Sequence, residues 1–64
     1  MATDPEIIQQ SYEAKLRHLF SVLHTKYLSA QGNEAQETDA NKRFQAGVRL
    51  ARKVRGIAKT LVTP

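Results

Sequence analysis

The residues whose types and spacing could do chemistry are basic and lie in the last third of the chain. Positions 42–64 hold seven Lys or Arg residues and no Asp or Glu, and the whole chain has a net charge of +4. Six of these cations fall on one side of a helix with about 3.6 residues per turn, namely Lys42, Arg49, Arg52, Lys53, Arg55 and Lys59. Such a face is the electrostatic footprint of a protein that contacts nucleic-acid phosphates, to which Arg adds bidentate hydrogen bonding.

The same basic face has a second interpretation, in which it is a solvent-exposed helix surface with no binding role. The helix dipole favours cations near a helix C-terminus and acids near its start, where Glu34, Glu37 and Asp39 lie. A charged face also keeps a small protein in solution. The sequence therefore leaves three functions open: contact with DNA or RNA phosphates, docking as an adaptor or inhibitor on an acidic protein, and a structural role in an assembly.

The sequence lacks the residue patterns of metal sites, disulfides and phosphate-binding loops. His18 and His24 are six residues apart, which places them about 120° apart around a helix, so they cannot hold one metal ion together. The chain has no cysteine, which excludes disulfides and thiolate zinc sites. Gly32, Gly47 and Gly56 form neither a phosphate-binding loop nor a dinucleotide fingerprint. We expect no catalytic site, no metal and no cofactor.

Two long helices must position the basic face, and the first is predicted over about residues 5–30. Asp4 is the expected N-cap, Pro5 suits the first helical position, and Gly32 suits the turn that ends the helix. Apolar residues recur in steps of three and four within an arc of about 120°. They are Ile8, Tyr12, Leu16, Leu19, Phe20, Leu23 and Tyr27.

The second helix is predicted to begin at residue 34 or 38, after a loop of about residues 31–37, and to end near Val62. Asn33 with Gln36 forms a capping box for the earlier start, and Thr38 favours the later one. Apolar and small residues repeat at heptad spacing and predict a hairpin or dimer seam, made of Ala40, Phe44, Gly47, Ala51, Val54, Ala58 and Leu61. Small seam residues let helix axes approach, and we expect them opposite Tyr12, Leu16, Phe20 and Tyr27.

These elements predict a single all-α domain over residues 1–64, an antiparallel two-helix hairpin. A chain of 64 residues buries only about 60% of its unfolded surface. The apolar arc of the second helix is about 200° wide, more than one neighbouring helix covers. We therefore expect a homodimer that forms a four-helix bundle. In shape this bundle is similar to small helical-hairpin proteins of phages and plasmids, including dimeric RNA-binding bundles that regulate plasmid copy number.

A cytoplasmic protein is expected, without a membrane partner. The sequence contains no run of about 18 apolar residues, and its first six residues, MATDPE, are unlike a secretory signal. Residues 44–62 do have the pattern of a basic amphipathic helix that lies on a membrane. Their apolar side is rich in Ala and Gly and lacks Trp, so we assign that side to the hairpin instead.

Overall fold

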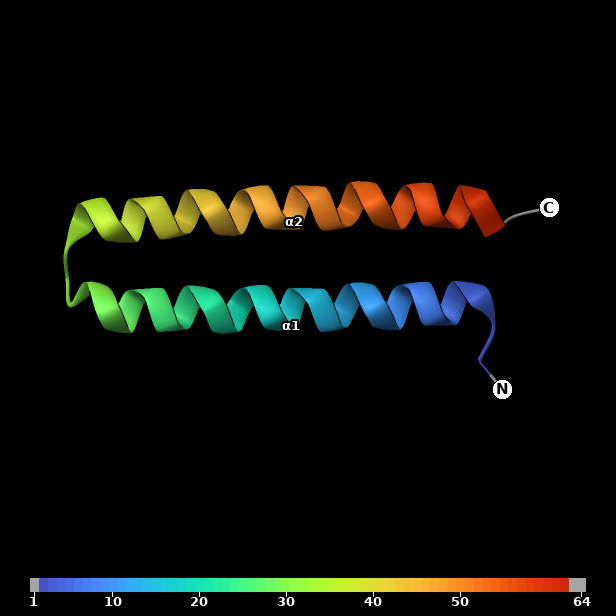
Figure 1. Ribbon diagram of the computed structural model, residues 1–64, viewed down its shortest axis with the longest axis horizontal. Coiled ribbons are helices and arrows are strands. Elements are labelled where there is room, and N and C mark those ends of the chain that lie inside the picture. Colours follow the sequence, from blue (N-terminus) through green and yellow to red (C-terminus); the bar gives the residue numbers. More distant parts are fainter. Residues whose placement is uncertain (1, 63–64) are drawn as a thin grey trace.

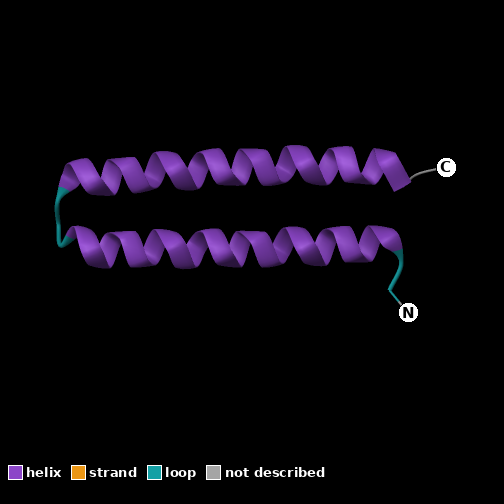
Figure 2. Ribbon diagram, in the orientation of Figure 1, coloured by secondary structure: helices purple, strands orange, loops and turns teal. Residues whose placement is uncertain are grey.

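The chain forms a hairpin of two antiparallel helices joined by a short turn (Figure 1, Figure 2). This computed structural model describes residues 2–62, in which α1 spans Asp4–Ala30 and α2 spans Glu34–Val62. The described residues contain no strand. The Cα atoms extend over 49 × 21 × 7 Å, so the helices form one flat layer. The prediction of an all-α antiparallel hairpin is confirmed.

The first helix begins one residue earlier than predicted, because Thr3 and not Asp4 is its N-cap. Thr3 has an extended backbone, and its Oγ1 accepts a hydrogen bond from the Glu6 N–H at 3.4 Å. The Thr3 carbonyl accepts the first helical bond from the Ile7 N–H at 3.0 Å. Asp4 therefore lies within the first turn, where its carboxylate interacts favourably with the helix dipole. Pro5 also lies in this turn, where its missing N–H costs nothing.

A tight turn at Gln31 and Gly32 reverses the chain. Both residues have positive φ angles, 49° and 84° respectively, and the Asn33 N–H donates to the Ala30 carbonyl at 3.0 Å. The Asn33 side chain then caps α2, since its Oδ1 accepts from the Gln36 N–H at 3.1 Å. Of the two predicted starts of the second helix, the structure therefore has the earlier one.

Small residues lie where the two helices pack against each other. Ala30 and Ala40 are the buried residues of the described chain, each about 5% exposed. Gly47 faces Leu19 so closely that a Cβ added to the glycine would lie 2.7 Å from Leu19 Cδ2. Near the turn, the Tyr27 hydroxyl donates to Asn41 Oδ1 at 2.6 Å. The hairpin is thus joined by a narrow line of contacts.

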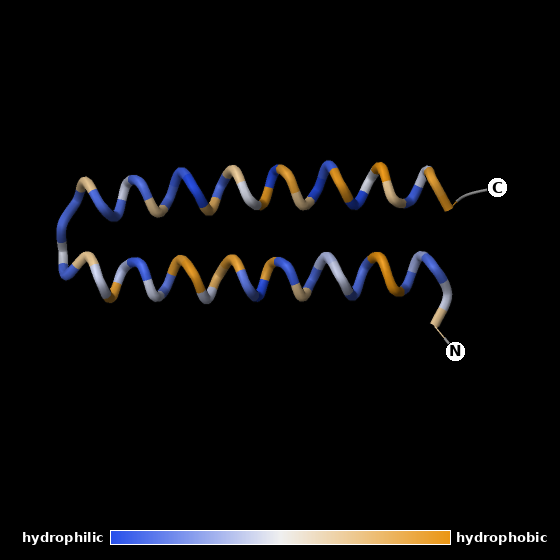
Figure 3. The backbone as a smooth tube through the Cα atoms, viewed as in Figure 1, coloured by the Kyte–Doolittle hydropathy of each residue, from blue (hydrophilic) through white to orange (hydrophobic). Residues whose placement is uncertain are grey.

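The bulky residue that faces Gly47 is Leu19, and the expectation that Phe20 would lie opposite the small seam was wrong. Phe20 is 63% exposed, because it lies about 100° around α1 from Leu19 and points out of the contact line. Figure 3 shows hydrophilic residues along the first turns of α2 and hydrophobic ones recurring along its second half. Neither helix of the described chain is both long and apolar enough to cross a bilayer.

Candidate nucleic-acid interface

Three of the predicted basic residues project from the outer side of α2. Ala51 is half-buried and marks the side of α2 that contacts α1. Lys42, Arg49 and Lys53 lie about 160–180° from Ala51 around the helix, and all three are exposed. They therefore point directly away from α1, and the helix contact does not cover them.

Two further cations lie on the flank of α2. Arg52 and Lys59 are about 100° and 80° from Ala51 around the helix, on the same side of it, and both are exposed. We call the exposed set the basic face, which consists of Lys42, Arg49, Arg52, Lys53 and Lys59. From the first of these residues to the last, the face extends about 25 Å along the helix axis.

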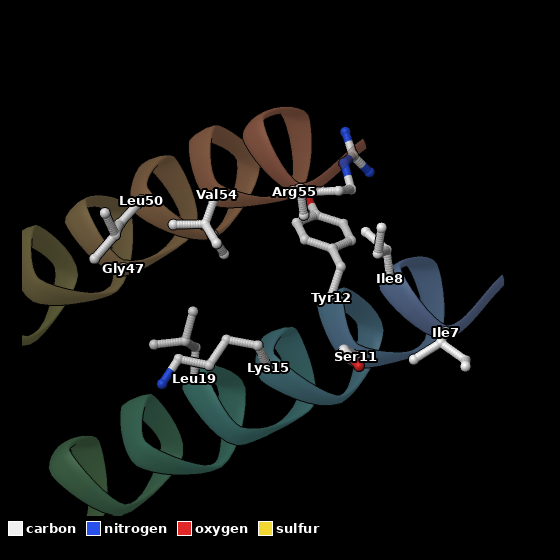
Figure 4. A pocket seen from close by; sticks show the side chains of 12 residues that line it. Ile7, Ile8, Ser11, Tyr12, Lys15, Leu19, Gly47, Leu50, Val54 and Arg55 are labelled. Carbon is white, nitrogen blue, oxygen red and sulfur yellow. The ribbon is translucent and has the colours of Figure 1, made fainter. Parts of the chain in front are cut away.

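Arg55 is placed apart from the basic face. It is half-buried, lies only about 40° from Ala51, and sets its guanidinium carbon 4.1 Å from the centroid of the Tyr12 ring (Figure 4). This is a cation–π contact between the two helices, in which the ring face attracts the charge. Arg55 thus contributes to the hairpin itself, a role that its position on a helical wheel did not reveal.

Arg43, which the sequence already separated from the other cations, forms an ion pair. Its Nε lies 3.0 Å from Asp39 Oδ2, one helical turn earlier, and both side chains are largely exposed. After Asp39 the sequence contains no further acid. Arg49, Arg52 and Lys53 of the basic face therefore have no carboxylate of α2 within one helical turn, whereas Lys42 lies three residues after Asp39.

The histidines and the acidic residues do not gather into a metal site in the part of the chain that the structure describes. His18 and His24 are both exposed on α1. Across residues 2–62, no group of three or more His, Asp or Glu residues is arranged to hold a metal ion.

The flat hairpin has a groove on each face. The first, of about 480 Å³, we call the apolar groove (Figure 4). Its lining residues are Ile7, Ile8, Ser11, Tyr12, Lys15, Leu19, Gly47, Leu50, Ala51, Val54, Arg55 and Ala58. The second, of about 580 Å³, we call the arginine groove, and it is lined by Tyr12, Leu16, Arg17, Phe20, Ser21, Phe44, Val48 and Arg52. Val54 and Arg52 lie about 160° apart around α2, so the two grooves open on opposite faces.

The predicted seam is divided into a part that α1 covers and a part that stays exposed. Ala40 is buried, and Phe44, Gly47, Ala51 and Ala58 are half-buried beside α1. Val54 and Leu61, by contrast, remain 53% and 79% exposed. Heptad spacing alone could not separate these two groups, because the wide apolar arc of α2 extends past the edge of its single neighbour.

The arginine groove was not predicted from the sequence. It combines the exposed Phe20 ring with Arg17 from α1 and Arg52 from α2. The signal for it was the 100° step from Leu19 to Phe20, which moves an aromatic ring from the contact line to the surface.

The chain was also compared with known proteins. No protein-family model matches it, and neither a curated protein nor a solved structure shows a significant match.

Proposed function

We propose that this protein is a small non-enzymatic regulatory or accessory factor that contacts nucleic-acid phosphates through the basic face of α2. The observation that carries the proposal is the outward projection of Lys42, Arg49 and Lys53, which are exposed and directed away from α1. With Arg52 and Lys59 on the flank, they form a stripe of one sign on a rigid helix. Cations that are held in fixed positions attract the phosphate backbone and release its counterions.

The composition of the face favours backbone contact over reading of the bases. The side of α2 that carries Lys42, Arg49 and Lys53 contains no aromatic side chain on which a base could stack. The helix is also uninterrupted over Glu34–Val62, unlike the short recognition helix of a helix-turn-helix protein. Binding is therefore expected to follow the charge and shape of a DNA duplex or an RNA stem, with little dependence on sequence.

The proposal is tested by titrating a labelled duplex with the protein at several salt concentrations and measuring fluorescence anisotropy. Five phosphate contacts give a slope of log K against log salt of about −4 to −5. The double variant Arg49→Gln, Lys53→Gln should reduce the slope by about 2, since two contacts are lost. Arg43→Gln is the matched control: its charge is paired with Asp39 and lies off the basic face, so the slope should stay close to that of the parent.

Two results would contradict phosphate binding. In one, the protein shows no affinity for the duplex even at low salt; in the other, the double variant and the control lose affinity equally. A protein that does not bind the duplex but forms a stoichiometric complex with an acidic protein would instead be an adaptor or inhibitor. A chain that does neither would have the structural role.

A further inference from the structure

The hairpin exposes more surface than a folded monomer of its size. Its accessible surface is 5204 Å² for a mass of 7.2 kDa. The scaling of folded monomers gives about 4,100 Å² for this mass. The surplus is about 1,100 Å², and a standard interface covers about 800 Å² on each partner. The surplus therefore has the size that one partner of ordinary dimensions would remove.

The exposed surface reflects the absence of a core. Only Ala30 and Ala40 are buried among residues 2–62, and no large side chain of that part is fully enclosed. A single layer of helices must bury its apolar side against a second layer to be stable. The molecule that supplies the second layer must be present wherever this chain folds. Another copy of the same chain is always present.

The apolar groove is the face that lacks cover. Leu50 and Val54 line it and are 62% and 53% exposed, and Ile57 and Leu61 continue the same surface toward the end of α2. These four residues fall within an arc of about 60° around the helix. In the arginine groove, by contrast, Phe20 is the one exposed large apolar residue of the lining, and arginines lie on both helices beside it.

The shape of the apolar groove suits its own copy. The groove is lined on α2 by the small residues Gly47, Ala51 and Ala58 and by the larger Leu50 and Val54. Figure 4 shows the Leu50 and Val54 side chains on the α2 side of the groove. In a two-fold symmetric interface the same patch meets itself, so it must supply both ridge and hollow. Large side chains of one copy that face small ones of the other give a closely packed layer.

The charges on and around the groove are compatible with this pairing. Lys15 borders the groove with a long apolar stem, which can lie on apolar surface while the ammonium reaches water at the edge. Arg55 is held over Tyr12. Lys42, Arg49 and Lys53 project from the outer side of α2, so pairing does not bring the basic faces of two copies into contact.

We propose that a second copy of this chain covers the apolar groove, and that the folded protein is a two-fold symmetric four-helix bundle with its basic faces outward. This inference concerns the protein alone and stands independently of phosphate binding. Sedimentation equilibrium without nucleic acid tests it, over concentrations from about 1 to about 200 µM, because the mass of a weak dimer varies with concentration.

The matched pair of variants is Val54→Asp in the apolar groove and Phe20→Asp in the arginine groove. The two parent side chains are similarly exposed in one hairpin, at 53% and 63%. The parent chain and Phe20→Asp should sediment at twice 7.2 kDa, and Val54→Asp should sediment as a monomer with reduced helical circular dichroism. The milder Val54→Ala should stay helical at high concentration and raise the dimer dissociation constant about tenfold.

Three outcomes would overturn the inference. The first is a parent chain that folds cooperatively as a 7.2 kDa monomer over the whole concentration range. The second is a Val54→Asp variant that keeps the dimer mass. The third is a dimer that Phe20→Asp abolishes and Val54→Ala leaves unchanged, which would place the interface on the opposite face.

Discussion

Leu19 of α1 lies so close to Gly47 of α2 that a Cβ at position 47 would be 2.7 Å from Leu19 Cδ2 and 3.2 Å from Cδ1. A glycine inside a helix costs about 1 kcal/mol relative to alanine. Here the close approach of the two helices offsets that cost, since any side chain at position 47 would have to displace Leu19. Gly56 lies on the same helix and has no neighbour within 4 Å of an added Cβ, so it provides the comparison.

Substitution of Gly47 should therefore destabilise the fold, and substitution of Gly56 should stabilise it. Gly47→Leu is expected to lower the free energy of unfolding by about 1–3 kcal/mol through overpacking. Gly56→Ala should raise it by about 1 kcal/mol through helix propensity alone. Urea unfolding followed by circular dichroism at one protein concentration measures both. A Gly47→Leu chain that is as stable as the parent would refute the contact.

The turn depends on the positive φ of Gly32. An added Cβ at this position meets no atom within 4 Å, so the effect of Gly32→Ala comes from the backbone alone. Since φ is +84°, the variant should lose about 1–2 kcal/mol of unfolding free energy. Gly56→Ala is again the control, with the opposite sign. If both variants are stabilising, the turn has a different backbone conformation from the one described.

Arg55 should contribute to stability and little to phosphate binding. Arg55→Gln removes the cation–π contact with Tyr12 and should cost about 0.5–1 kcal/mol of unfolding free energy. In the duplex titration, its salt slope should remain within experimental error of the parent. Tyr12→Leu keeps an apolar side chain and removes the ring. The double variant Tyr12→Leu, Arg55→Gln should therefore lose less unfolding free energy than the two single variants lose together. A drop of about 1 in the salt slope would instead assign Arg55 to the basic face.

The sequence predicts where the helices begin and end better than it predicts which of their sides face each other. Proline-free periodicity and the Asn33 cap predicted both helices, and the end of α1 and the earlier start of α2 agree with the structure. A helical wheel could not predict the rotation of each helix about its axis, which decides the residues that face the other helix. That rotation is set by packing, and a step of one residue decides whether Leu19 or Phe20 meets Gly47. The same limitation placed Arg55 among the exposed cations.

For the proposed dimer, the distribution of polar residues on the groove face predicts how the two copies are oriented. Asp39 precedes Leu50 by eleven residues and Lys26 follows Lys15 by eleven, about three helical turns, so the groove face becomes polar near the turn. Its apolar residues lie in the half of the hairpin that is farther from the turn. A two-fold axis along the length of the hairpin places apolar half on apolar half, with both turns at one end of the bundle.

Spin labels test this orientation. The chain has no cysteine, so Glu34→Cys introduces a single attachment site beside the turn. In a dimer with both turns at one end, the distance between the two labels should be well below the 49 Å length of the hairpin. A distance close to that length or longer would mean that the two turns lie at opposite ends of the dimer.

The most direct test of the basic face is sedimentation equilibrium of the protein with a short generic duplex at low and at moderate salt. We expect a complex at low salt that is heavier than the protein alone and that dissociates at moderate salt, because added salt reduces the entropy gained when counterions are released. The Arg49→Gln, Lys53→Gln variant should keep the mass of the protein alone at moderate salt and bind more weakly at low salt. If the parent protein never gains mass with the duplex, the basic face does not bind phosphates, and the claim fails.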